Sequence, residues 1–116
     1  MKIQSVEAFP CDGGFATRNW LFVKITTDNG IVGWGEGHDW QAAPSLAVAV
    51  ELVGREIIGQ DPRRIEWINQ QLWYSGRCGV PERMKAIAAI DIALWDIKAK
   101  SLGVPVYELL ELLQKS

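Results

Sequence analysis

The sequence contains one histidine, His38, and two cysteines, Cys11 and Cys78. With a single histidine, neither a Ser/His/Asp nor a Cys/His set is convincing, and no nucleophile elbow or Walker motif is present. The cysteines lie far apart in the sequence and form no CxxC pair. We expect two free thiols, as in a cytoplasmic protein, with a single disulfide as the alternative.

Long hydrophobic runs and an excess of one charge are also missing. No apolar run reaches the roughly 18 residues of a membrane span, and the N-terminus lacks the apolar core of a signal peptide. The 12 basic and 14 acidic side chains give a net charge of -2, which argues against binding to nucleic acid or to an anionic membrane. The 116 residues are 48% apolar and 22% charged. This balance is typical of one globular domain over residues 1–116.

The first part of the chain predicts strands over residues 2–10, 19–28 and 30–37. In the second of these, Leu21, Val23 and Ile25 alternate on one face. Asp28, Asn29 and Gly30 form a strong hairpin signal. We therefore expect a three-stranded, largely antiparallel meander with a Gly-containing loop between its first two strands.

The rest of the chain predicts helices over residues 44–59, 61–74, 81–102 and 106–115. Asp61 is placed as an N-cap and Pro62 at the first helical position. Gly103 suits the left-handed residue that ends a helix, and Pro105 blocks its continuation. Strands followed by helices predict an α+β fold, in which a three-stranded meander precedes a bundle of three to four helices.

The helix over residues 81–102 carries two apolar faces. One face contains Met84, Ile87, Ala88, Asp91, Leu94, Trp95, Lys98 and Leu102, and the second contains Ala86, Ile90, Ala93 and Ile97. A helix of this kind packs between two layers, and small alanines let those layers come close.

Four side chains of this helix are interpreted as structural anchors: Asp91, Trp95, Asp96 and Lys100. Asp91 lies within an apolar stripe, where a carboxylate needs a partner, which we expect on another element. A general acid/base or metal-ligand role for Asp91 is the alternative. Asp96 and Lys100 are four residues apart with the acid first, which favours a surface ion pair.

Gly33, Gly35 and Gly37 alternate along the third strand and leave one face bare, so that another backbone or a ligand can approach closely. The G-x-G-x-x-G pattern fails because position 38 is histidine, which argues against dinucleotide binding. Glu36 and His38 share a strand face, but one histidine with few converging carboxylates favours a polar loop end over a metal site. We therefore assign neither catalytic residues nor metal ligands within this chain.

Three segments together resemble a known family: "NWLFVKITTDNGIVGWGE", "IIGQDPRRIE" and "AIAAIDIALWDIKAKSLGVPVYELL". They resemble the N-terminal capping domain of the mandelate racemase and muconate lactonizing branch of the enolase superfamily, over about residues 1–110. Arg18-Asn19 before the second strand is similar to the sugar-acid dehydratases of that branch. The resemblance implies abstraction of the proton α to a carboxylate, with the enediolate stabilised on Mg²⁺.

In that family the chemistry lies in a (β/α)₈ barrel, which would follow position 110 and has no counterpart here. The resemblance therefore implies a barrel domain as partner and Mg²⁺ for the full-length enzyme, with none bound by this chain alone. The loops over residues 11–19 and 37–44 would shape substrate specificity. Their pocket-facing candidates for an acid-sugar or other carboxylate substrate are Phe15, Arg18, Asn19, His38 and Trp40.

Three functions remain open on the sequence. In the first, the chain is the capping domain of a Mg²⁺-dependent enzyme and is inactive alone. In the second, it is a free-standing structural or homo-oligomeric module. A second copy would then cover the face that would otherwise meet a barrel, and the apolar tail would serve as that cover through Leu109, Leu110, Leu112 and Leu113. The third, a small ligand-binding domain, rests on the Trp-rich loops.

Overall fold

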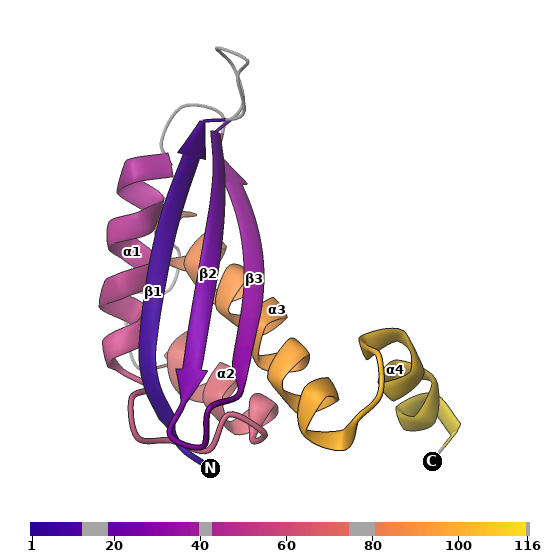
Figure 1. The fold of residues 1–116 in the computed structure, drawn as a ribbon. Coiled ribbons are helices and arrows are strands. Elements are labelled where there is room, and N and C mark those ends of the chain that lie inside the picture. The colour runs from indigo at the N-terminus through magenta and orange to yellow at the C-terminus, as the bar shows by residue number, and fades with distance from the viewer. Residues whose placement is uncertain (13–18, 40–42, 75–80, 116) are drawn as a thin grey trace.

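The computed structural model describes residues 1–12, 19–39, 43–74 and 81–115. Three strands come first, and four helices follow (Figure 1). The strands are β1 (Ile3–Asp12), β2 (Asn19–Thr27) and β3 (Val32–Asp39), and the helices are α1 (Ala43–Arg55), α2 (Ile65–Tyr74), α3 (Pro81–Leu102) and α4 (Val106–Lys115). The predicted α+β fold is confirmed, and α4 extends to one side of the rest (Figure 1).

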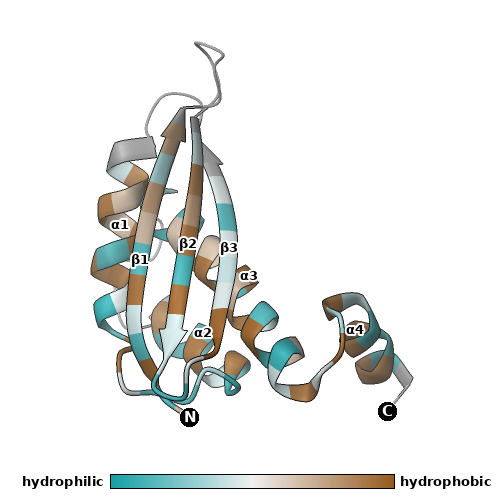
Figure 2. Cartoon of the chain, viewed as in Figure 1, coloured by the Kyte–Doolittle hydropathy of each residue, from teal (hydrophilic) through white to brown (hydrophobic). Residues whose placement is uncertain are grey.

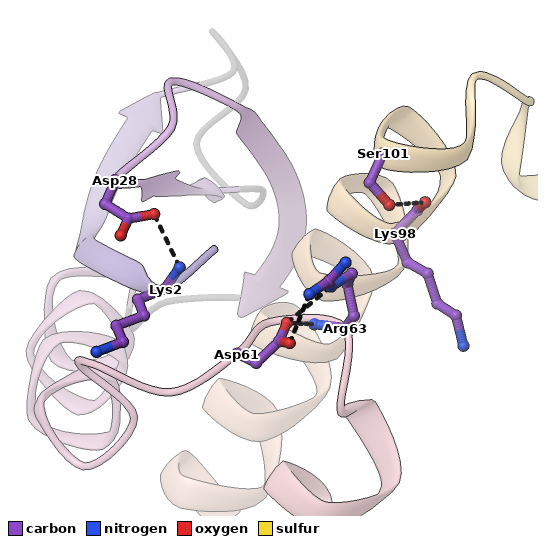
Figure 3. Close-up of polar contacts among 6 residues, drawn as sticks. All are labelled: Lys2, Asp28, Asp61, Arg63, Lys98 and Ser101. Atoms are coloured by element: carbon purple, nitrogen blue, oxygen red, sulfur yellow. Dashed lines mark hydrogen bonds and ion pairs between the residues drawn. The ribbon is translucent and has the colours of Figure 1, made fainter.

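The strands form an antiparallel sheet in the order β1-β2-β3, which confirms the predicted meander. The hairpin turn between β2 and β3 is closed by the Thr27 amide, which donates to the Ile31 carbonyl at 2.9 Å. Gly30 adopts a φ of 86° there, as the hairpin signal requires. The Lys2 amide donates to the Asp28 carboxylate at 2.9 Å and ties the chain's start to this turn (Figure 3). β3 runs two residues later than predicted.

The two faces of the sheet differ. Leu21, Val23 and Ile25 of β2 are fully buried in the core formed with the helices. Residues on the opposite face remain open, with Phe22 37% and Trp34 45% exposed. The alternation along β2 is visible as bands of contrasting hydropathy in Figure 2.

Helix α3 packs against β3 at very short range. A Cβ atom built on Gly35 would lie 2.0 Å from the Ala89 carbonyl oxygen, and one on Gly33 would lie 2.5 Å from that of Ala93. The bare strand face is therefore filled by a helix backbone rather than by a ligand. Small residues on both elements allow this contact.

Two helix boundaries differ from the sequence prediction. Asp61 does not start α2, which begins at Ile65. The Asp61 carboxylate instead accepts the Arg63 amide at 2.9 Å and forms an ion pair with its guanidinium (Figure 3), so that residues 61–64 form a turn before the helix. Helix α1 ends at Arg55, and the chain turns through residues 56–59, where Gly59 has a φ of 87°.

The end of α3 confirms the predicted stop. Gly103 has a φ of 71°, and the Val104 amide donates to the Ala99 carbonyl at 3.1 Å. The predicted first apolar face of α3 is wrong in part, because Met84 is 42% and Leu102 57% exposed and Ala88 is exposed too. The helix turns Ala89 and Ala93 toward the sheet, which rotates that stripe outward. Among the described residues, no helix is long and apolar enough to cross a membrane.

Candidate functional site

The two segments that carry the predicted substrate-facing residues leave the sheet at the same end. Asp12 pairs with Asn19, and Asn19 pairs with Asp39 across the three strands. His38 lies beside Trp20 in the same region. The side chains of Asn19 and His38, and the whole of Phe15, Arg18 and Trp40, lie outside the part of the chain that the structure describes. Strand pairing therefore brings both loop stems together.

Asp91 finds its partner on α2. The Asn69 side-chain amide donates to the Asp91 carboxylate at 2.8 Å, and both side chains are partly buried. Lys98, on the same stripe, lies with its ammonium 5.5 Å from the centre of the Trp95 ring. The contact between Asp91 and Asn69 therefore joins α3 to α2.

Asp96 and Lys100 form more than an ion pair along α3. Their charged groups lie 2.9 Å apart, the Asp96 carboxylate accepts the Trp34 amide at 2.9 Å, and the Lys100 ammonium donates to the Val32 carbonyl at 2.7 Å. Because β3 is an edge strand, its outer amides and carbonyls have no strand partner. We call these two side chains the edge clamp, since they satisfy the β3 backbone from the neighbouring helix.

A groove lies next to the edge clamp. Its volume is about 490 Å³, and its lining residues come from β3, α3 and α4: Trp34, Ile92, Trp95, Asp96, Val106 and Leu110. Ile92 is 50% and Leu110 45% exposed. We call this the α3–α4 groove.

Sequence reasoning did not find the α3–α4 groove. One signal was available: Lys85, Asp96 and Lys100 form a polar strip along α3, and Ile92 lies on this strip, seven residues after Lys85 and four before Asp96. A single exposed isoleucine is common on protein surfaces, and only the neighbouring side chains of α4 make it part of a groove. The second wall of the groove is α4. The sequence does not specify the direction of the turn after α3 that places α4 beside Ile92.

Within the described ranges of the chain, no three His, Cys, Asp or Glu side chains are grouped to hold a metal ion. Asp61 has its pKa shifted: the hydrogen bond from the Arg63 side chain lowers the pKa of its carboxyl. That carboxyl lies in the turn before α2, away from the sheet end that bears the loops.

In solved structures, the fold matches a member of the enolase superfamily from Salmonella Typhimurium, with a TM-score of 0.82, 36% identity and coverage of 94% of this chain and 29% of that one. An enolase from Agrobacterium radiobacter with bound sodium and L-malate gives a TM-score of 0.85 and 34% identity, over 96% of this chain and 28% of that one.

A family model described as "Mandelate racemase / muconate lactonizing enzyme, N-terminal domain" matches residues 8–111. The chain belongs to this family of N-terminal domains.

Curated relatives include two D-galactonate dehydratases. The protein from Pectobacterium atrosepticum is 54% identical over 92 residues, which are 78% of this chain and 24% of that protein. The one from Ralstonia nicotianae is 52% identical over the same shares. The chain therefore spans about a quarter of the length of the curated relatives it matches.

Proposed function

We propose that residues 1–116 form one capping domain of a sugar-acid dehydratase that acts with a barrel domain outside this sequence. Its similarity to the D-galactonate dehydratases carries the proposal, because it extends over most of the chain. The reaction would remove a proton α to the carboxylate of an acid sugar. A cytoplasmic location belongs to the same proposal and is supported by the low cysteine content.

The domain would contribute substrate recognition. Phe15, Arg18, Asn19, His38 and Trp40 would reach the substrate from the loop-bearing end of the sheet. The pairing of Asn19 with Asp39 supports this, since both loop stems start from adjacent positions. The Arg18 guanidinium would bind the substrate carboxylate or a hydroxyl group through charge-assisted hydrogen bonds.

Magnesium would belong to the full-length enzyme. The described residues do not fit a Mg²⁺ site, because no group of three carboxylate, histidine or cysteine side chains converges within them. We assign no metal-dependent step to this chain. Its contribution is to bind and orient the substrate and to exclude water.

A domain exchange tests this function. Residues 1–111 of this chain would replace the matching domain of the Pectobacterium atrosepticum D-galactonate dehydratase, and turnover of D-galactonate would be measured with Mg²⁺. We expect the chimera to be active, whereas the 116-residue chain alone should show no turnover. A folded chimera without activity on D-galactonate or on a panel of related acid sugars would contradict the proposal, as would turnover by the isolated chain.

Self-association is the second candidate function. Leu110, Leu112 and Leu113 of α4 are 45%, 58% and 46% exposed, and apolar surfaces of this kind attract partners. Under this alternative a second copy covers α4 and the domain needs no barrel. Light scattering on the 116-residue chain across concentrations decides this: a stable dimer favours the alternative, and a monomer at high concentration removes it.

A further inference from the structure

We propose that a cavity between α2, α3 and α4 binds a small organic acid that carries hydroxyl groups. The cavity has a volume of about 330 Å³, within the range of about 300–1,000 Å³ that is typical of small-molecule sites. We call it the tryptophan cavity, and its lining residues are Arg63, Arg64, Ile65, Glu66, Trp67, Trp95, Lys98 and Leu113. None of them belongs to the loops over residues 11–19 and 37–44. The cavity would therefore bind its ligand whether or not those loops contact a substrate.

The tryptophan cavity contains positive charge that no carboxylate balances. Three of its lining residues are basic, and one of these, Arg63, already pairs with Asp61 at 2.9 Å. No ion pair of the described residues involves Arg64 or Lys98. Glu66 is the one carboxylate in the lining, so the two unpaired cations outnumber it. Lys98 is also partly buried and its side chain extends away from α3 (Figure 3), so its ammonium group is incompletely hydrated and would gain from an anionic partner.

Two tryptophan rings hold these cations in place. The Arg64 guanidinium lies 5.3 Å from the centre of the Trp67 ring, and the Lys98 ammonium lies 5.5 Å from that of Trp95. A cation over an exposed ring is held more weakly than one that donates a charge-assisted hydrogen bond to a carboxylate. Both groups are therefore positioned before a ligand arrives and can still turn toward its acid group. This positioning reduces the entropy that binding would otherwise cost.

The other lining residues indicate what the ligand carries besides its acid group. The Glu66 carboxylate accepts hydrogen bonds and repels a second acid group, so it favours hydroxyl groups on the ligand. Trp67 is 48% exposed and offers apolar surface to the carbon chain of the ligand. A monocarboxylic sugar acid combines these features. Its carboxylate would join Arg64, in the turn before α2, to Lys98 on α3.

Nuclear magnetic resonance of the 116-residue chain tests the tryptophan cavity. The chain has six tryptophans, whose indole N–H signals report on six separate places. D-Galactonate would be titrated at constant ionic strength, with D-galactose and sulfate as comparison solutes. We expect the signals of Trp67 and Trp95 to shift saturably, with a Kd on the order of 1 mM. The signal of Trp34 should stay in place, and neither comparison solute should reproduce the shifts.

Single substitutions identify the groups that bind. Arg64→Gln and Lys98→Gln should each weaken binding by about 10-fold or more, because each removes a charged donor to the acid group. Lys24→Gln is the matched control, because the Lys24 ammonium also lies over a tryptophan, 5.7 Å from the centre of the Trp34 ring, but outside the cavity. It should leave the Kd unchanged. Arg18→Ala should leave it unchanged too, since Arg18 belongs to the loops.

The outcomes separate the tryptophan cavity from the proposed reaction. Saturable shifts of the two cavity tryptophans that either cavity variant weakens support the site, even if the chimera is inactive. The absence of a saturable shift up to about 50 mM, or an affinity that both cavity variants leave unchanged, overturns it even if the chimera turns over D-galactonate. Equal shifts with D-galactose remove the need for an acid group, and equal shifts with sulfate mean an adventitious ion only. Shifts at Trp20 that Arg18→Ala removes would place the ligand at the loops. Each of these three results also overturns the site.

Discussion

Replacing Gly35 by alanine is the sharpest test of how α3 sits on the sheet. A Cβ atom at this position would lie 2.0 Å from the Ala89 carbonyl oxygen and 3.1 Å from the Ala93 amide nitrogen. These neighbours are helix backbone, which cannot move aside as a flexible side chain can. The helix would have to withdraw from β3 by more than about 1 Å to restore ordinary contact distances.

The magnitude follows from three effects. Overpacking of a core costs about 1–3 kcal/mol. The same withdrawal would stretch the hydrogen bond from the Trp34 amide to Asp96, now 2.9 Å, and a hydrogen bond to a charged group is worth about 1.5–3 kcal/mol. Against these, alanine stabilises by about 0.4–1 kcal/mol through the unfolded chain. The net destabilisation of Gly35→Ala should be about 1.5–5.5 kcal/mol.

Gly37→Ala is the matched control on the same strand face. Its Cβ would meet the Ala89 Cβ at 3.5 Å and the Leu46 Cδ2 at 3.6 Å, which are ordinary contacts. It should be neutral or slightly stabilising. Urea denaturation followed by circular dichroism measures both, and Gly35→Ala should also lower Tm by about 10 °C or more. If the two variants agree within about 0.5 kcal/mol, the close approach of α3 to β3 is refuted.

Three further predictions concern polar groups. Asp96→Ala and Lys100→Ala should each destabilise by about 1–3 kcal/mol in urea denaturation, because each removes the ion pair and a charge-assisted hydrogen bond to the β3 backbone; no measurable cost for either variant would contradict the edge clamp. The lowered pKa of Asp61 stabilises the fold above the ordinary carboxyl pKa of about 3.9, and this stability is lost as pH falls through the folded-state pKa. Asp61→Asn should therefore reduce Tm at neutral pH but have no such effect in stronger acid. A Tm difference that stays constant down to pH about 2 would argue against it. In the chimera, Arg18→Ala should raise KM for D-galactonate by about 10–100-fold, whereas Arg55→Ala should not; an unchanged KM would remove Arg18 from the substrate site.

The sequence predicted the features of the fold that are determined by residues close together in the chain. The meander followed from the alternation of Leu21, Val23 and Ile25 and from the turn at Gly30, and the end of α3 followed from Gly103. The close approach to Gly35 was also foreseeable, because a bare strand face invites a backbone.

The features that failed or were missed depend on tertiary placement. The Asp61 carboxylate satisfies a tight turn as well as it would a helix start, so the sequence signal was ambiguous. The outward rotation of Met84 and Leu102 depends on which side of α3 meets the glycines. The ion pair between Asp96 and Lys100 was predicted from their spacing, but their backbone partners on β3 were not, because a helical spacing does not tell which strand lies at the sheet edge beside the helix.

Activity of the domain-exchange chimera is the measurement that bears most directly on the central claim. A chimera that carries residues 1–111 of this chain on the remainder of the Pectobacterium atrosepticum D-galactonate dehydratase should dehydrate D-galactonate with Mg²⁺, and the 116-residue chain alone should not. Turnover by the isolated chain, or a folded chimera that leaves every acid sugar unchanged, would contradict the claim that this chain is a capping domain.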